Sequence, residues 1–455
     1  MLIYVVSLIA TLSILILVHE FGHFFAAKLV GIQVPRFSLG FGKRLAGFQW
    51  GETEFVLSAI PLGGYVKMAG MEDDEAAEAL EGGGPPPEEV DPARTFDAKP
   101  LWARTLVITA GVIMNLVFAF VVYSALFLSQ GTRIVTETRL SVAGAAQNPA
   151  AVRAGFTRVP EGARLVEVAG RPVRAWNDAA DALEGAPAGP AQLRFADAPP
   201  VSVTLPGGSS ARIEALQGLS PFAEPVLESV QGGSPAQRGG LRAGDRVTAV
   251  EGRPIVSWQQ LVTAIQGHPG KPLRLLVARG GRTLALTVTP NAERDTDANG
   301  KRVMVGRIGA GIPQPAGVDR RVGVGEAVRL GARTTWGSAA LIGDFLKRLV
   351  AGQVSARNMG GLLSIGQASG ETAQLGLAVW LGFLAFFSVN LAVLNLLPIP
   401  ILDGGHLMFL AFEAVRGRPL SVEARIRLSQ VGLVIVVALM LWANGNDVVR
   451  LVFGR

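Results

Sequence analysis

The 455-residue sequence contains no cysteine. This absence excludes disulfide frameworks, thiolate nucleophiles, cysteine zinc fingers and iron–sulfur clusters, so any bound metal ion must be held by histidine, aspartate or glutamate. Charged residues are scarce as well, at 17% of the chain against about 25% in soluble globular domains. Together with a positive mean hydropathy, this scarcity argues against a wholly soluble or a disordered protein.

The sequence also lacks basic runs interleaved with aromatic residues, which is the pattern of a nucleic-acid-binding surface. The formal net charge is +6, but the lysines and arginines are scattered along the chain. We therefore expect no nucleic-acid partner and attribute the positive excess to membrane topology.

Four apolar stretches predict membrane spans, at residues 1–27, 101–128, 375–397 and 428–442. A secretory signal peptide is the alternative for the first stretch, but its opening MLIYVV carries no basic residue. Lysine and arginine are concentrated between the first two spans and between the last two, which predicts that both of these loops are cytoplasmic. The long region between the second and third spans would then be periplasmic.

This long region contains an internal repeat. GARLVEVAGRPVRAW at residues 162–176 and GDRVTAVEGRPIVSW at residues 244–258 share the spacing from glycine to glycine to tryptophan. Each copy indicates a strand, a Gly-Arg-Pro turn, a strand edge and a short helix. The pattern resembles PDZ domains in their bacterial periplasmic form, although the first copy departs from it at residues 157–161.

Three further segments are expected between the spans and the repeat. Residues 31–70 alternate in the manner of strands and predict a β-hairpin region. Residues 71–100 are acidic and then rich in glycine and proline, which is typical of a solvated loop. Residues 320–372 include an amphipathic helix, which lies either along the membrane surface or against the second repeat copy as a linker helix.

The clearest chemical motif is H-E-x-x-H, formed by His19, Glu20 and His23. On a helix, histidines at positions i and i+4 project from one face, so both bind one zinc ion while the glutamate reaches the water bound to that ion. Ionisable side chains are costly in an apolar span, which favours a functional role. The alternative is a pair of histidines that share a hydrogen bond at a helix end.

Catalytic zinc keeps three protein ligands, and the motif supplies two of them. Of the other histidines, His268 is expected on the far side of the membrane. His406 follows Asp403 in the stretch NLLPIPILDGGH, and the predicted topology places both near the same end of the bilayer as His19. The third ligand is therefore either Asp403 or His406, and donor chemistry alone does not choose between them.

The motifs HEFGH at the end of the first span and NLLPIPILDGGH at the end of the third, with a PDZ-like pair between spans two and three, resemble the site-2 protease family of intramembrane zinc metalloproteases. The resemblance covers nearly the whole chain. It implies a multi-pass α-helical membrane protein with four transmembrane helices, a membrane-associated β-hairpin and two tandem PDZ-like α+β domains.

The resemblance also implies roles for individual residues. It makes Asp403 the third zinc ligand and leaves His406 as a neighbour of the site. Glu20 becomes the general base and later the proton donor. Asn390, Asn395 and Pro400 are expected to contribute to substrate binding, whereas the general alternative for an asparagine in a membrane helix is a hydrogen bond to a neighbouring helix.

The expected segments follow the chain in order. They are the first span with H-E-x-x-H (1–30), the hairpin region (31–70), the acidic cytoplasmic loop (71–100), the second span (101–130), two PDZ-like domains (131–215 and 222–312), the amphipathic linker (320–372), the third span with the L-D-G motif (373–410), and a cytoplasmic loop with the fourth span (411–455).

We thus expect a zinc endopeptidase of the bacterial inner membrane that acts in regulated intramembrane proteolysis. Its expected substrates are single-span membrane proteins, such as an anti-sigma factor, and residual signal peptides. Peptide tails at the PDZ-like domains and membrane lipid are further expected partners. The alternative is a catalytically silent PDZ membrane scaffold with a structural zinc, against which the intact Glu20 argues.

Overall fold

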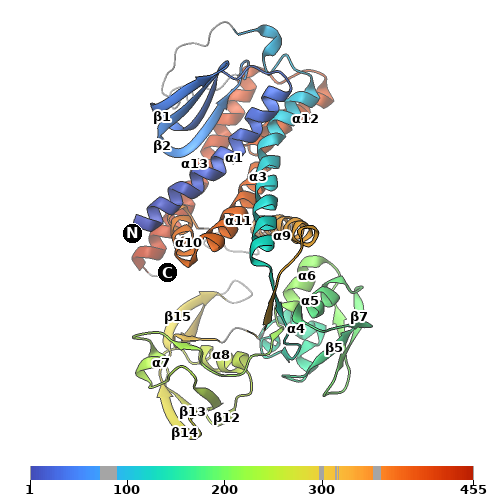
Figure 1. Ribbon diagram of the computed structural model, residues 1–455, viewed down its shortest axis with the longest axis vertical. Helices are drawn as coiled ribbons and strands as arrows, with labels where there is room; N and C mark the ends of the chain where they lie inside the picture. The colour runs from blue at the N-terminus through green and yellow to red at the C-terminus, as the bar shows by residue number, and fades with distance from the viewer. Residues whose placement is uncertain are drawn as a thin grey trace. The chain divides into compact units, whose positions relative to one another are not determined.

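The computed structural model describes residues 2–71, 90–296, 302–312, 315, 317–351 and 360–453. The expected acidic loop therefore lies largely outside the described residues. The chain divides into two compact units, of which one comprises Met1–Gly131 with Arg321–Arg455 and the other Thr132–Arg320 (Figure 1).

The first unit is built on long apolar helices. Within the described residues, four helices are long and apolar enough to cross a membrane: α1 (Leu2–Leu29), α3 (Leu101–Gln130), α11 (Leu377–Asn395) and α13 (Val422–Phe453). None contains a proline, so each helix continues without a break. At most 39% of their most apolar windows is buried, which leaves most of that surface facing outward, as in helices that contact lipid.

Shorter helices complete this unit, namely α9 (Val324–Val350), α10 (Leu362–Leu375) and α12 (Asp403–Arg416). The amphipathic helix α9 packs against α3 and α11, where Ile342 joins Ala119, Ala385 and Val389 in one apolar cluster. Helix α10 packs against α1. The long helices therefore cover part of the apolar face of the expected linker segment, whereas Trp336 and Leu341 of α9 remain exposed.

The segment after α1 forms the antiparallel hairpin of β1 (Arg36–Trp50) and β2 (Thr53–Lys67). Because β2 folds back on itself, Phe37 of β1 lies opposite both Phe55 and Val66. The hairpin lies alongside α1 (Figure 1). Phe24 of α1 connects the helix to the hairpin through ring contacts at 5.5 Å with Phe37 and 5.6 Å with Phe55.

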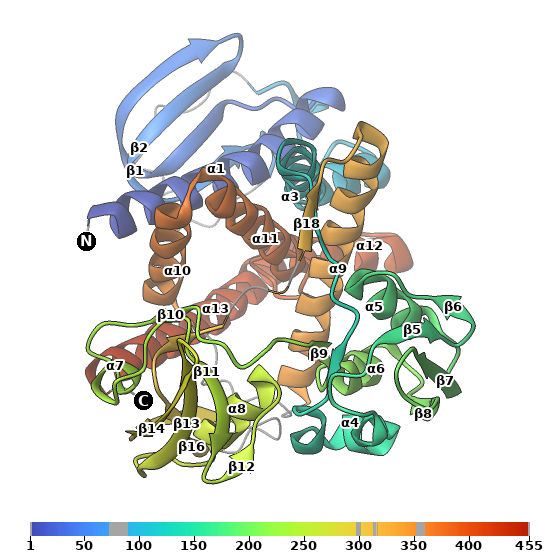
Figure 2. The ribbon, with the colours of Figure 1, turned by 60° about the horizontal axis from the view of Figure 1, so that its bottom comes forward.

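The second unit contains the internal repeat as two sheets of the same strand order (Figure 2). In the first copy the sheet order is β6-β5-β7-β8, and in the second it is β12-β11-β13-β14. The first copy consists of β5 (Leu165–Val168), β6 (Arg171–Pro172), α5 (Trp176–Gly185), β7 (Gly189–Phe195) and β8 (Val201–Leu205). The second consists of β11 (Arg246–Val250), β12 (Arg253–Pro254), α8 (Trp258–Gln266), β13 (Leu273–Arg279) and β14 (Arg282–Val288).

The Gly-Arg-Pro turn has the same conformation in both copies. Ala169 and Glu251, the residues before the glycine, have φ of 46° and 49°, and Gly170 and Gly252 also have positive φ. Positive φ at both central residues is the signature of a type I′ turn, whose twist suits a tight hairpin. The matching sequences therefore produce matching turns.

Shorter elements connect and extend these sheets. They are β3 (Thr132–Val135), β4 (Leu140–Ser141), α4 (Pro149–Ala154), α6 (Ser209–Leu216), β9 (Ser220–Pro221), β10 (Ser229–Val230), α7 (Pro235–Arg238), β15 (Asn291–Thr296), β16 (Arg302–Arg307), β17 (Ala310–Gly311) and β18 (Gly317–Arg320). In the first copy, a short 3-10 helix at Phe156–Arg158 follows α4 and includes the first two of the departing residues 157–161; Phe156 is fully buried in the core of that copy.

Candidate metal centre

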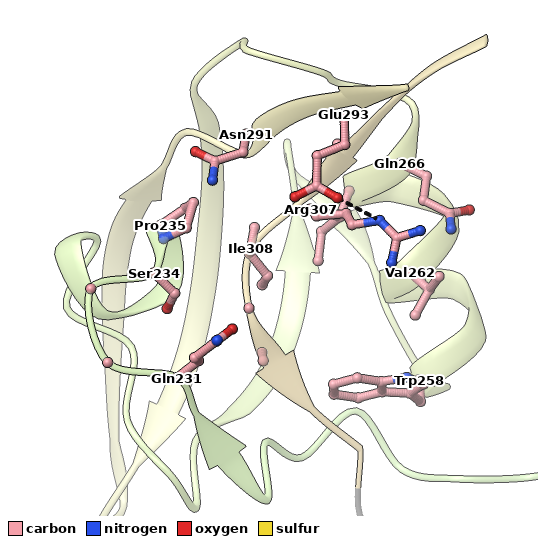
Figure 3. A pocket seen from close by; sticks show the side chains of 16 residues that line it. Gln231, Ser234, Pro235, Trp258, Val262, Gln266, Asn291, Glu293, Arg307 and Ile308 are labelled. Atoms are coloured by element: carbon pink, nitrogen blue, oxygen red, sulfur yellow. Dashed lines mark ion pairs between the residues drawn. The ribbon is translucent and has the colours of Figure 1, made fainter. Parts of the chain in front are cut away.

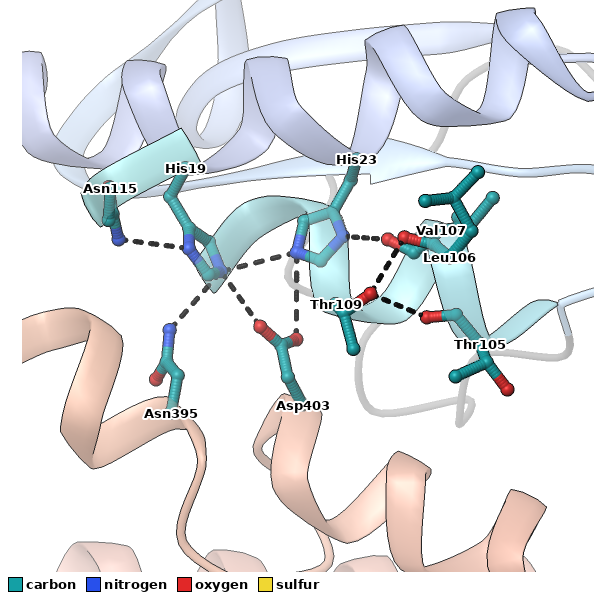
Figure 4. Close-up of polar contacts among 9 residues, drawn as sticks. All are labelled: His19, His23, Thr105, Leu106, Val107, Thr109, Asn115, Asn395 and Asp403. Carbon is teal, nitrogen blue, oxygen red and sulfur yellow. Dashed lines mark hydrogen bonds and ion pairs between the residues drawn. The ribbon is translucent and has the colours of Figure 1, made fainter. Parts of the chain in front are cut away.

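The H-E-x-x-H residues lie on α1. His19 and His23 are one helical turn apart, so both imidazoles project from the same face of the helix, and both side chains are buried. The ring centroids are 4.8 Å apart, and the two Nε2 atoms are 3.2 Å apart. Helix geometry alone therefore brings two nitrogen donors together (Figure 4).

Asp403 reaches these histidines from the opposite end of the sequence, as the first residue of α12. Helix α11 ends at Asn395 because Pro398 and Pro400 cannot continue it. The loop then directs the carboxylate towards the histidines (Figure 4): one oxygen, Oδ2, lies 3.3 Å from Nε2 of His19, and the other, Oδ1, lies 3.5 Å from Nε2 of His23.

Two glycines allow the tight turn that starts α12. An added Cβ at Gly404 would lie 2.3 Å from the carbonyl oxygen of Leu397, and one at Gly405 would lie 2.3 Å from that of Ile399. No side chain is tolerated at such distances. The pair of glycines therefore lets the loop fold directly against the helix that begins with Asp403.

The donor atoms fit a zinc ion. In a tetrahedral site with ligands at about 2.0–2.1 Å, neighbouring ligand atoms are about 3.3 Å apart. The two Nε2 atoms are 3.2 Å apart, and each lies 3.3 or 3.5 Å from a different oxygen of the Asp403 carboxylate. Oδ2 of Asp403 is buried and has no hydrogen-bond partner among the described residues, which suits an oxygen that faces a metal. Two nitrogens and one carboxylate leave the fourth position open, as in catalytic zinc sites.

Helix α3 supports the histidines from the side away from Asp403. Nδ1 of His23 lies 2.8 Å from the carbonyl oxygen of Val107, and Nδ1 of His19 lies 3.1 Å from Nδ2 of Asn115 (Figure 4). Both contacts engage Nδ1 and leave Nε2 for the metal, which is the usual arrangement around ligating histidines. Gly111 permits this approach, because a Cβ there would lie 2.3 Å from Nε2 of His23.

Asn115 is a site residue that the sequence analysis missed. Its side chain is fully buried, and its Oδ1 has no hydrogen-bond partner among the described residues. Turning the amide by 180° presents Oδ1 to the Nδ1–H of His19, which satisfies both groups when Nε2 binds a metal. The sequence did contain a signal for Asn115, because a polar side chain is costly in an apolar span. The same argument applies to Asn390 and Asn395.

Glu20 follows His19 on α1 and is half-buried. Its Cγ lies beside Gly64 of β2, where an added Cβ would be 3.4 Å away, and the same Cβ would be 2.8 Å from a methyl carbon of Ile16. Glu20 therefore lies where the helix with the donor histidines meets the β-hairpin.

The predicted substrate-binding residues differ in their distance from the donors. Nδ2 of Asn395 lies 3.2 Å from Nε2 of His19, at the edge of the donor cluster (Figure 4). Pro400 lies in the loop before α12, and its carbonyl oxygen accepts a hydrogen bond from Ser429 of α13. Asn390 is half-buried on α11, and its side chain makes no hydrogen bond within the described part of the chain.

The remaining histidines lie outside the donor cluster, which in the described part of the chain comprises His19, His23 and Asp403. His406 packs on Phe409 of its own helix, with the ring centroids 5.9 Å apart. His268 belongs to the other unit, where its Nδ1 lies 2.8 Å from the carbonyl oxygen of Ala264 in the preceding helix α8.

The second repeat copy contains a cavity of its own, with a volume of about 510 Å³. Val262, Ile265 and Ile308 contribute apolar side chains to its lining. Figure 3 shows Arg307 and Glu293 together at its edge, where they form an ion pair of 3.0 Å. The cavity therefore combines an apolar lining with charged groups at one side.

Long apolar helices that carry an H-E-x-x-H motif and a converging carboxylate define a membrane zinc metalloprotease. Comparison with known proteins agrees with this class. The family model described as Peptidase family M50 matches residues 7–439, and the chain belongs to this family.

Several relatives match the chain over nearly its full length. The regulator of sigma-E protease RseP of Escherichia coli is 36% identical, and the protease RseP of Yersinia pestis is 35% identical, each over 98% of both chains. A protein of Neisseria meningitidis whose name includes the words zinc metalloprotease is 35% identical over the same share. These matches confirm the predicted resemblance to the site-2 protease family.

Proposed function

We propose that the protein is an intramembrane zinc endopeptidase of the bacterial inner membrane, which cleaves transmembrane segments of single-span membrane proteins in regulated intramembrane proteolysis. The observation that carries this proposal is the cluster of three metal donors, His19, His23 and Asp403, next to Glu20 on α1. The names of the RseP relatives support an anti-sigma factor as substrate. Residual signal peptides are a second substrate of the same kind.

The site residues divide the chemistry between them. His19, His23 and Asp403 hold the zinc ion, which when bound acidifies a water molecule and polarises the scissile carbonyl. Glu20 takes a proton from the attacking water and later delivers it to the leaving amine. Nδ2 of Asn395 lies 3.2 Å from the metal-facing nitrogen of His19, beside the position where the scissile bond would bind. From there its amide donates a hydrogen bond to the substrate backbone.

Cleavage requires an extended substrate, because a helix engages its own carbonyl groups in hydrogen bonds. Residues 64–66 of β2 pair with β1 on one side only in the described chain. This segment begins at Gly64, the residue that approaches Glu20. We propose that the unwound substrate adds to this edge as a further strand, and that Asn390 and Pro400 contact it from the side of α11 and the following loop.

The membrane orientation follows from the positively charged loops. The PDZ-like domains are periplasmic, the zinc site lies towards the cytoplasmic side, and lipid surrounds the spans. The cavity in the second copy supports binding of extended peptide tails there, because its apolar lining and charged edge suit side chains and backbone of an extended peptide.

Purified wild-type protein and the Glu20→Gln variant, mixed with a single-span substrate, test the proposed reaction. Wild type is expected to cleave in a manner that a zinc chelator stops, and Glu20→Gln is expected to bind zinc without cleaving. Equal cleavage by the two proteins would remove Glu20 as the base. No cleavage by zinc-loaded wild type would favour the scaffold alternative.

Bound zinc in Asp403→Ala and His406→Ala tests the ligand set separately. We expect zinc to be lost from the first variant and retained by the second. The reverse result would make His406 the third ligand.

A further inference from the structure

The third metal donor is the first residue of α12, a helix without a side-chain cap at its start and with a glycine at its end. Before α12, the chain passes through a loop with two prolines. No side chain caps the N-terminus of the helix, where Leu402 is the N-cap residue. After α12, Gly417 ends the helix in the left-handed conformation, with φ of 73°. Apolar side chains on its outer face, such as Phe412 and Val415, are exposed. The loop before the helix and the contacts on its inner face therefore together determine where Asp403 lies.

One largely buried ion pair joins α12 to α3, with the Glu413 side chain 17% exposed. The guanidinium of Arg104 donates to both carboxylate oxygens of Glu413, at 3.0 and 2.5 Å, while its Nε donates to the carbonyl oxygen of Lys99 at 3.0 Å. Arg104 is only 8% exposed. Among the described residues, this is the only ion pair between the two helices, and its two-pronged geometry restricts both distance and angle.

Helix α3 therefore contacts both halves of the metal centre. Val107 and Asn115 hold His23 and His19, and Arg104, about one turn before Val107, holds the helix that carries Asp403. Ten residues separate Asp403 from Glu413, which is about 15 Å along a helix that moves as one body. A shift at Glu413 is then transmitted to the carboxylate of Asp403, and metal sites tolerate only about 0.2 Å.

We propose that Arg104 and Glu413 are positioning residues, which set α12 against α3 and thereby place Asp403 for zinc. The inference rests on the proposed role of Asp403 as a ligand. It assigns the pair a geometric role because a buried ion pair adds little net stability, and its replacement by apolar residues of similar volume is often neutral or stabilising.

That difference between geometry and stability provides the test. The full-length protein in detergent is prepared as Glu413→Gln, as Arg104→Lys and as the double variant Arg104→Met with Glu413→Met. Zinc affinity is measured by competition with a chelator, and the coordination geometry by the visible absorption of the cobalt-substituted protein. Thermal unfolding of the metal-free protein reports stability.

We expect each variant to lose zinc affinity by roughly 10–100-fold and to show a weakened tetrahedral cobalt spectrum. The double variant is decisive, because its metal-free form should unfold near the wild-type temperature. The control is Asp97→Asn. Asp97 lies 4.0 Å from Arg104 and 3.6 Å from Arg425, and its own side chain is 44% exposed, so its loss should leave zinc affinity unchanged.

Wild-type zinc affinity and cobalt spectrum in the double variant would overturn the proposal. Should Glu413→Gln fail to fold, Arg104→Lys keeps the charge while removing the two-pronged contact, and a wild-type affinity there would overturn it equally. Asp403→Ala separates failure of the ligand set from failure of the positioning role. Zinc retained in Asp403→Ala refutes the ligand set itself. Zinc lost there but kept in the double variant refutes only the positioning role.

Discussion

Replacing Gly111 by alanine should disable the metal centre through a single methyl group. The added Cβ would lie 2.3 Å from Nε2 of His23 and 2.7 Å from Cε1 of His19, where ordinary contact begins at 3.4 Å. The imidazoles or α3 must therefore retreat by about 1 Å, several times the ~0.2 Å that metal–ligand distances tolerate. We expect a loss of roughly 100-fold or more in zinc affinity and in cleavage rate.

Zinc content after dialysis, chelator competition and cleavage of a single-span substrate measure this effect. The matched control is Gly382→Ala on α11, because the nearest atom to its added Cβ is Cδ1 of Leu126 at an ordinary 3.8 Å. Alanine is also the better helix former, so the control should fold and bind zinc like wild type. Stoichiometric zinc with wild-type affinity in Gly111→Ala would refute the close packing of α3 on the histidines.

Three further predictions follow from buried polar groups. Asn115→Ala should weaken zinc binding by roughly 10–100-fold, measured by chelator competition, and unchanged affinity would contradict its hydrogen bond to His19. Asp245→Ala should destabilise the Thr132–Arg320 unit by roughly 1–3 kcal/mol, because the buried carboxylate accepts hydrogen bonds from Arg279 at 2.6 and 2.7 Å. Thermal unfolding measures this loss, and an unchanged unfolding temperature would contradict it. Burial alone would raise the pKa of Asp245, but the hydrogen bonds from Arg279 and the Arg242 backbone outweigh it and lower this pKa. The ionised Asp245 therefore stabilises the fold fully above its unfolded pKa of about 3.9, and this stabilisation is lost as pH falls through the lower folded pKa. The difference in stability between wild type and Asp245→Ala should therefore narrow only below about pH 4. A difference that persists in stronger acid would argue against the lowered pKa.

Much of the architecture was predictable because it depends on short-range patterns. The four spans were visible as apolar runs, and the structure extends the fourth from the expected 428–442 to α13 at Val422–Phe453. Charged residues at the start and end of that helix hid its full length, since hydropathy locates the apolar centre better than the ends. The repeat was readable for a similar reason: equal spacing of glycine and tryptophan gives equal turns and sheet orders.

The support around the metal donors was less predictable. Asn115 and Gly111 are separated from the motif by about ninety residues of sequence, and only the packing of α3 on α1 brings them to the histidines. Gly111 gives no signal in a chain with 56 glycines. Whether a glycine allows close approach depends on its neighbours in space, and these are not adjacent in sequence.

The sequence by itself determined that two imidazoles share a face of the first apolar helix, because helical periodicity acts within a few residues. It also narrowed the third donor to Asp403 or His406. Only the tertiary structure shows which of the two lies beside the histidines: the Asp403 carboxylate is 3.3 and 3.5 Å from the two Nε2 atoms, whereas His406 packs on Phe409. Which of the two side chains reaches the histidines depends on the direction of α12 after the loop with Pro398 and Pro400. Long-range contacts such as the ion pair between Arg104 and Glu413 set that direction.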